Sequence, residues 1–299
     1  MCAYLLGQEK TGKVMAGCLF VVSTPIGNLD DLSARARITL EQVNWIACED
    51  TRHSGQLLSQ LGISTRLVSY HDHNEKERSE DLLARLQAGE TGALISDAGT
   101  PLLSDPGYVL VRACQQAGIQ VVPVPGASAL LAALAVAGLP TDRFRFQGFL
   151  PAKGSARDKA LAEALACPMT VVLYEAPHRL QTLLEEVVAR EPERELALCR
   201  ELTKRFETVK RLSAQELLAW VKADDNQQKG EMVLLLAPAA ARSGVNEELL
   251  RLAALLLEEL PASRAAKVLA AWSGEKRQAM YQLLEQLPPA KQGAVDRIS

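Results

Sequence analysis

The sequence predicts an α/β protein built from two α/β domains and a small C-terminal helical extension. From residue 19 to residue 236, short apolar runs typical of strands alternate with amphipathic stretches typical of helices. Repeated β-α units of this length predict a largely parallel sheet with helices on both faces. Pro125-Gly126 interrupts the series, and from Arg242 onward only helical patterns remain. We therefore expect an N-terminal extension over 1–17, α/β domains over 18–126 and 127–240, and the helical extension over 241–299.

The first domain is expected to contain five strands and four helices. Gly62 and Gly118 follow two of the helical patterns, and glycine is favoured just beyond a helix end because it adopts a left-handed conformation at low cost. The expected strands are 19–23, 45–48, 67–70, 93–96 and 120–124, and the expected helices are 31–43, 54–61, 76–87 and 106–117.

The second domain repeats the alternation, and the extension does not. Pro261 and Ser273-Gly274 divide the extension into three helical stretches. The expected strands are 144–149, 170–174, 196–199 and 232–236, and the expected helices are 127–137, 156–166, 179–190, 214–222, 247–260, 263–272 and 275–287. The extension carries basic residues that nearly equal numbers of acidic residues balance, so RNA binding and a solvated surface both stay open for it.

Composition indicates an ordinary globular protein. The chain has 299 residues, is 48% hydrophobic and has a formal net charge of −3, so any contact with nucleic acid must be local. No apolar run approaches the length of about 18 residues that a membrane helix needs, and no membrane partner is expected. The six cysteines form no CxxC pair, which favours reduced thiols in a cytoplasmic protein. Charged residues before Val14–Cys18 argue against a secretion signal there.

The loop over 94–107 is the strongest candidate for a binding site. It follows a predicted strand, and open α/β sheets bind ligands at the carboxyl ends of their strands. Gly99 and Gly107 lack side chains that would keep the backbone away from a ligand. Asp105-Pro106 predicts an N-cap followed by proline in the first helical turn.

A group of charged residues follows the predicted strand at 45–48. Glu49, Asp50, Arg52 and His53 lie together in sequence. We favour a catalytic role for Glu49, Asp50 and Arg52, because such a compact run of acidic and basic side chains after a strand is richer than helix capping requires. The alternative is that they cap and stabilise the helix that opens near Ser54.

Two locally basic stretches lie in the second domain, over 143–159 and 200–211. Arg200, Lys204 and Arg205 are expected to hold substrate phosphates, and an exposed helix start is the alternative. The stretches are expected to matter more for RNA binding than Arg264 or Lys276 in the extension.

A metal site is not expected. His71 and His73 alternate on an extended segment, but no third ligand lies nearby in the sequence and the spacing is unlike that of a zinc site.

Four loops together resemble the tetrapyrrole methylase superfamily. They are Thr24–Leu32, Cys48–Gly55, the 94–107 loop and Val124–Ala129. Corrin-pathway members carry Gly-x-Gly-Pro-Gly-Asp after the first strand, whereas this chain has Thr-Pro-Ile-Gly-Asn. It is therefore similar to the branch that methylates small-subunit ribosomal RNA.

The resemblance implies S-adenosylmethionine bound in a cleft between the two α/β domains. A Rossmann dinucleotide site competes poorly, because no G-x-G-x-x-G follows the first strand, and there is no Walker A motif. The expected cofactor-binding residues are Pro25, Gly27, Asp97, Ala98, Gly99, Thr100, Ser104, Ala127, Ser128, Tyr174, Gly230 and Met232.

The resemblance further implies 2′-O-methylation of a cytidine in 16S rRNA of the small ribosomal subunit, by a homodimer. A corrin-precursor or protein methyltransferase, or a protein that binds S-adenosylmethionine without turnover, stays open as an alternative, because a fold does not fix a substrate.

Overall fold

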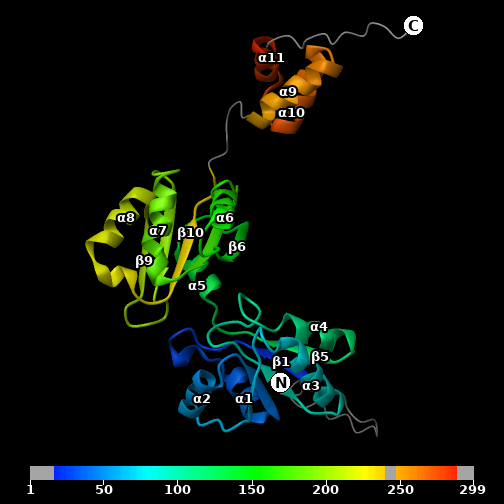
Figure 1. Ribbon diagram of the computed structural model, residues 1–299, viewed down its shortest axis with the longest axis vertical. Helices are drawn as coiled ribbons and strands as arrows, with labels where there is room; N and C mark the ends of the chain where they lie inside the picture. The colour runs from blue at the N-terminus through cyan, green and yellow to red at the C-terminus, as the bar shows by residue number, and fades with distance from the viewer. Residues whose placement is uncertain (1–16, 240–246, 288–299) are drawn as a thin grey trace. The chain divides into compact units, whose positions relative to one another are not determined.

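The computed structural model describes residues 17–239 and 247–287 (Figure 1). All but the last residue of the predicted N-terminal extension lies outside them, as do residues 241–246 and 288–299 of the predicted helical extension. The chain divides into two compact units, and the boundary along the sequence falls between Pro238 and Ala239. The first unit contains both sheets and the second contains three helices. A domain boundary at residue 126, inside the first unit, stays a prediction.

The first sheet is entirely parallel, as predicted, with strand order β3-β2-β4-β1-β5. Its apolar side chains alternate between two faces. Phe20 and Val22 pack with α1 and α2, while Leu19 and Leu94 pack with α3 and α4. The elements are β1 Cys18–Val22, η1 Leu29–Asp31, α1 Ala34–Gln42, β2 Trp45–Cys48, α2 Thr51–Gln60, β3 Leu67–Ser69, α3 Glu75–Gln87, β4 Gly92–Leu94, α4 Tyr108–Gln116 and β5 Gln120–Val124.

The second sheet is mixed, with strand order β6-β7-β10-β8-β9. β6 and β7 are parallel and the other neighbours are antiparallel. The sequence failed to reveal β9 because this edge strand exposes charged side chains and has no apolar run. The elements are α5 Ala129–Val136, β6 Phe144–Phe149, α6 Ser155–Leu165, β7 Thr170–Glu175, α7 Pro177–Val188, β8 Glu195–Arg200, β9 Thr208–Ser213, α8 Ala214–Ala223, η2 Asp225–Gln228 and β10 Met232–Leu236.

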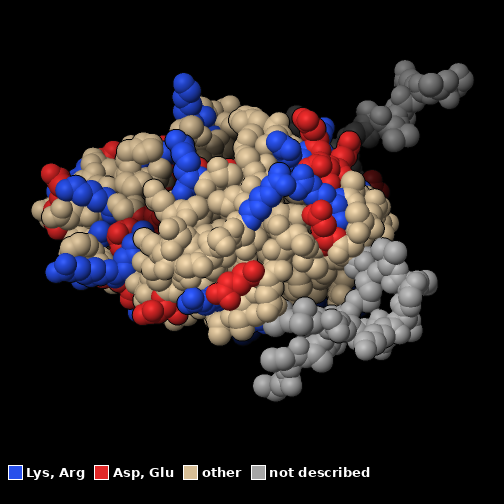
Figure 2. All heavy atoms as spheres, turned by 90° about the horizontal axis from the view of Figure 1, so that it is seen from below, with Lys and Arg blue, Asp and Glu red and all other residues tan. Residues whose placement is uncertain are grey.

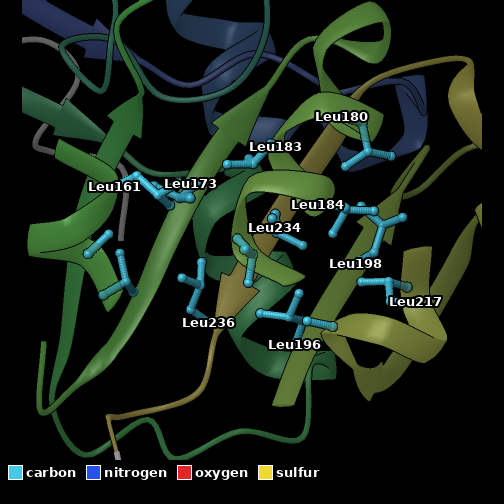
Figure 3. Packing of buried hydrophobic residues seen from close by; sticks show 14 of the residues in the cluster. Leu161, Leu173, Leu180, Leu183, Leu184, Leu196, Leu198, Leu217, Leu234 and Leu236 are labelled. Carbon is cyan, nitrogen blue, oxygen red and sulfur yellow. The ribbon is translucent and has the colours of Figure 1, made fainter. Parts of the chain in front are cut away.

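The two faces of the second sheet have different neighbours. On one face, leucines of β7, β8 and β10 pack with leucines of α6, α7 and α8 (Figure 3). On the other face, α5 packs over Val172 and Leu235. Ile26, from the loop after β1, joins this second cluster. The two sheets are therefore linked by shared apolar packing at the loops that follow β1 and β5.

The start of α4 differs from the prediction. The helix begins at Tyr108, and Asp105 is not its cap. Glu75 of α3 performs that role, because its Oε1 accepts hydrogen bonds from the N–H groups of Gly107 at 3.0 Å and Val109 at 3.3 Å. A carboxylate from another helix thus satisfies the first orphan donors of α4, so Asp105 is not needed as a cap.

The second unit is a three-helix cluster of α9 Glu247–Glu259, α10 Ala262–Ser273 and α11 Arg277–Gln286. Its core includes Ala253, Ala266, Leu269 and Met280. Gly274, with a φ of 74°, ends α10 in the left-handed conformation, as expected for glycine at this position. No helix in the described part of the chain has the length and apolarity needed to cross a membrane.

Candidate active site

A cavity of about 780 Å³ opens where the loops of the first sheet meet the second sheet. Its lining combines residues that follow β1, β2, β4 and β5 with residues of β7, β8 and β10 and the loops beside them. The predicted site residues on its wall are Glu49, Asp97, Ala98, Gly99, Thr100, Ser104, Ser128, Tyr174, Lys204, Gly230 and Met232. Segments far apart in the sequence therefore share one cavity.

Internal hydrogen bonds hold the loops of the first sheet. Thr24 and Gly99 exchange backbone hydrogen bonds of 2.8 and 3.1 Å. The Thr100 hydroxyl lies 2.9 Å from Ser23 Oγ and donates to the Ala127 carbonyl at 3.1 Å. The backbone of Gly99 and the hydroxyl of Thr100, which we expected to face a cofactor, are thus engaged in holding the cavity wall. The tight turn of Gly99, with a φ of 84°, serves this contact.

Ser128 differs from these residues because its hydroxyl is free to bind. The side chain is buried, lines the cavity, and has no hydrogen-bond partner for its Oγ within the described chain. A buried hydroxyl without a partner is costly, so a ligand that bonds to it gains affinity.

Backbone strain concentrates beside the cavity. Four non-glycine residues of the described chain have a positive φ: Leu102, Ser104, Glu201 and Thr203. They belong to two loops, and Ser104 and Glu201 line the cavity directly. Such conformations persist where surrounding contacts impose them, and they cluster at functional sites.

One wall of the cavity is acidic. Glu49, Asp97 and Asp105 line it. Burial, reinforced by the negative charge of Glu49, raises the pKa of Asp105 to about 6. Burial and the charge of Asp97 also raise the pKa of Glu49. No ion pair to these three carboxylates is found in the described chain, and Asp105, with its pKa of about 6, is able to accept a proton near neutral pH.

On the opposite wall, Lys204 forms ion pairs with two carboxylates. Lys204 Nζ lies 3.0 Å from Glu201 Oε1 and 3.2 Å from Glu231 Oε2. Burial alone would raise the pKa of Glu201, but hydrogen bonds from the Glu231 N–H and from Lys204 outweigh it and hold that pKa below its usual range. Gly230 is required here, because any Cβ would collide with the Glu201 side chain.

An aromatic pair completes this second wall. Tyr174 and Phe149 both line the cavity, and their ring centroids are 5.7 Å apart in an edge-to-face arrangement. Below them, Glu175 is held by Arg179 at 3.1 Å and Arg157 at 3.7 Å. The side chain of Glu175 is fully buried, so this ion cluster fixes the end of β7 beneath the rings.

The three predicted catalytic residues do not all lie at the cavity. Glu49 lines the cavity, whereas Asp50 and Arg52 do not. Asp50 caps α2 by accepting from the Arg52 N–H at 2.8 Å and the His53 N–H at 3.4 Å. The Arg52 side chain is 90% exposed and pairs with Asp50. For Asp50 and Arg52 the geometry supports the capping alternative.

The basic residues after β8 also have different environments. Arg200 is buried, and its guanidinium donates to the carbonyls of Lys229 and Phe206 and to Thr208 Oγ1. The expectation of an exposed phosphate contact is therefore wrong for Arg200, because its donors hold the loop that leads into β9. Lys204 is occupied by its two carboxylates, and Arg205 is exposed beside the Phe206 ring. No helix begins in this segment.

Three predicted cofactor residues are not on the cavity wall. Pro25 is buried between Thr24 and Ile26, and the Ala127 carbonyl accepts from Thr100. Gly27 lies against the aliphatic part of Lys204, where a Cβ would not fit.

Sequence reasoning missed Asp105 and Phe149 as site residues. Asp105 was assigned to the helix cap because Asp-Pro is a common helix start. Phe149 ended an apolar strand and gave no signal of its exposure, which is 54%. For the metal, no group of three or more suitable side chains occurs among residues 17–239 and 247–287.

Comparison with known proteins gives the family. The family described as Tetrapyrrole (Corrin/Porphyrin) Methylases matches residues 18–218. The family described as RsmI C-terminal HTH domain matches residues 243–288. The chain belongs to the tetrapyrrole methylase family, which confirms the prediction of a methyltransferase from the four loops.

Individual relatives narrow this assignment. "Ribosomal RNA small subunit methyltransferase I" of Escherichia coli O157:H7 is 50% identical over 276 residues, 92% of this chain and 96% of that protein. The protein of the same name from Pseudomonas aeruginosa is 51% identical, over 89% of this chain and 96% of its own length. Within the methylases, the chain belongs to the family that bears this name.

Solved structures share the fold. The methyltransferase CobJ has a TM-score of 0.56 and 20% identity over 77% of this chain and 97% of its own. Uroporphyrin-III C-methyl transferase from Thermus thermophilus, complexed with S-adenyl homocysteine, has a TM-score of 0.51 and 21% identity over 74% of this chain and 97% of its own.

Proposed function

We propose that this protein transfers the methyl group of S-adenosylmethionine to the ribose 2′-hydroxyl of a cytidine in small-subunit rRNA. Its membership of a family named for small-subunit rRNA methylation supports the substrate. The observation that carries the chemistry is the cavity with one acidic and one neutralised wall, described above.

The cavity suits the proposed cofactor. Its volume lies in the range of sites for ligands of this size. The unpartnered Ser128 hydroxyl offers a hydrogen bond, and the carboxylates of Asp97 and Glu49 would favour a sulfonium cation. When bound, S-adenosylmethionine supplies an electrophilic methyl group. Tyr174 and Met232 would supply apolar contact from the second wall.

We propose Asp105 as the group that accepts the proton. As the C–O bond forms and the bond from methyl carbon to sulfur breaks, the ribose hydroxyl must lose its proton. A carboxylate with a pKa of about 6 is mostly ionised at neutral pH yet binds a proton readily, which suits a general base. Glu49 lines the same cavity, and its negative charge helps to raise the pKa of Asp105.

The direct test is transfer of tritiated methyl groups to purified small ribosomal subunits, with corrin precursors and no acceptor as parallel reactions. We expect label in rRNA only, in a dinucleotide that resists alkaline hydrolysis because its 2′-oxygen is blocked. Label in corrin precursors, or cofactor binding without transfer to any acceptor, would contradict the proposal.

The oligomeric state and the location complete the proposal. We propose a homodimer in the cytoplasm that binds rRNA, following the family resemblance. Sedimentation of the purified full chain should give twice the monomer mass of 32.4 kDa. A monomer under assay conditions would contradict the dimer.

A further inference from the structure

Several of the basic residues that the sequence offered for RNA binding are ion-paired within the first unit. Arg157 pairs with Glu186 at 3.0 Å, and Arg211 pairs with Glu195 at 3.1 Å. Arg145 lies 3.8 Å from Glu163. The face in Figure 2 likewise intersperses basic and acidic side chains over a largely uncharged surface. Paired bases attract a polyanion weakly, because their partners cancel their field.

The second unit contrasts with this arrangement. α10 contains Arg264 and Lys267 and no acidic residue, and Lys276 and Arg277 follow at the start of α11. Among the described residues, none of these four bases has a carboxylate within salt-bridge distance. Glu275 is the one acidic residue between positions 260 and 284. The positive charge is therefore local and unpaired.

These bases face one surface. Ala265, Ala266 and Leu269 bury one side of α10, which places Arg264 and Lys267 on the opposite side. The Arg277 guanidinium donates to the Ser263 carbonyl at 3.2 Å, so the side chain of Arg277 reaches the residue next to Arg264.

Exposed aromatic rings belong to the same helices. Trp272 of α10 is 52% exposed and Tyr281 of α11 is 40% exposed. In contrast, Trp45 of the first sheet is only 1% exposed. Unpaired bases and exposed aromatic rings on the same helices are the combination that binds single-stranded nucleic acid, since the bases contact phosphates and the rings stack on nucleobases.

We propose that the surface formed by Arg264, Lys267, Trp272, Lys276, Arg277 and Tyr281, called here the α10–α11 surface, binds a single-stranded segment of RNA. Its bases contact phosphates and Trp272 stacks on a nucleobase. The inference rests on the proposed function only for the source of this RNA, the small ribosomal subunit. It reverses the expectation that Arg264 and Lys276 matter less than the bases of the second sheet.

The test measures binding of the full-length protein to a short fluorescein-labelled single-stranded RNA and to purified small subunits at several salt concentrations. The double variant Arg264→Glu/Lys267→Glu should bind the RNA more weakly and reduce the salt slope by about 1.4, or about 0.7 for each lost contact. Trp272→Leu should weaken binding roughly tenfold and remove the RNA-induced quenching of tryptophan fluorescence. Trp272→Phe should retain most of the affinity.

Arg251→Glu is the matched control, because it makes the same charge change at an exposed base of α9. Its salt slope should equal that of the wild type. Wild-type affinity and slope in the double variant, with unaltered thermal unfolding, would overturn the inference. If the double variant bound the short RNA normally but no longer bound the subunits, the inference would also be overturned, and the surface would instead contact a protein partner.

Methyl transfer by each variant separates this inference from the proposed function. If the wild-type protein shows no transfer while RNA binding depends on the α10–α11 surface, the proposed function fails and the inference stands. If transfer occurs and substitutions in the α10–α11 surface leave the RNA affinity unchanged, the inference alone fails.

Discussion

The two walls of the cavity use carboxylates in opposite ways. On the wall built from the first sheet, Asp105 and Glu49 form no ion pair in the described chain, and burial raises the pKa of each. On the wall built from the second sheet, Lys204 holds Glu201, and the pKa of Glu201 lies below its usual range. The difference separates a group suited to proton transfer from one that fixes a loop.

The same comparison distinguishes the loop that carries the proposed general base from the loop that supports the cavity wall. The strained loop with Ser104 carries the first kind of carboxylate, and the strained loop with Glu201 carries the second. Glu75 of α3, distant in sequence, holds the first loop through the Gly107 N–H, and Arg200, which directly precedes the second loop, holds it through the Phe206 carbonyl. The predictions below test this division.

The largest effect is expected from closing the first wall. Gly99→Val would force a side chain into a backbone with φ of 84°, with its Cβ 3.3 Å from Ile26 Cγ2. Ser128→Phe would fill the cavity directly. Both should reduce S-adenosylmethionine binding below detection by calorimetry. Gly118→Val is the control, because it has similar backbone strain in open space at a φ of 72°. Wild-type affinity in both cavity variants would refute this site.

Asp105→Asn should follow in magnitude. Loss of the general base should lower kcat by about 10²-fold or more, while calorimetry shows nearly unchanged cofactor affinity. In the wild type, kcat should rise with pH around the pKa of about 6. A normal kcat in the variant would exclude Asp105 as the base.

The same variant should change stability with a definite sign. The raised pKa means that the folded protein binds more protons than the unfolded chain between about pH 4 and pH 6. Ionised Asp105 is therefore unfavourable in the fold, and wild-type stability relative to Asp105→Asn should fall as the pH rises through this window. Chemical denaturation at several pH values measures this difference.

Glu201→Gln on the second wall should show the opposite pH dependence. The lowered pKa of Glu201 means that its carboxylate stabilises the fold above the unfolded value near 4.5, and this stabilisation disappears as the pH falls. Loss of the charged hydrogen bonds should cost about 1.5–3 kcal/mol at pH 7. The same slope sign for Asp105 and Glu201 would break the comparison between the walls.

The smallest effect is expected at Asp50, outside the cavity. Asp50→Ala should lower the midpoint of thermal unfolding by a few degrees and leave kcat unchanged, because the side chain caps α2. Asp50→Ser, which keeps a capping oxygen, should restore the midpoint. A large loss of kcat in both variants would show that Asp50 takes part in catalysis.

The sequence by itself determined the order and type of nearly all elements. Apolar periodicity identified the parallel first sheet and the three helices of the second unit, since each element must bury one face or stripe. The four loops indicated the methylase family. They also located the part of the cavity wall that the first sheet supplies, because the carboxyl ends of parallel strands meet at one edge of a sheet.

Only the tertiary structure decided what each polar residue does. Asp105 is not a helix cap because Glu75, distant in sequence, occupies the orphan N–H groups of α4. Arg200 is not a surface base because β9, whose sequence shows no apolar run, pairs with β8 and encloses it. Hydrogen-bond partners and burial set the charge of a side chain, and both depend on segments that only folding brings together.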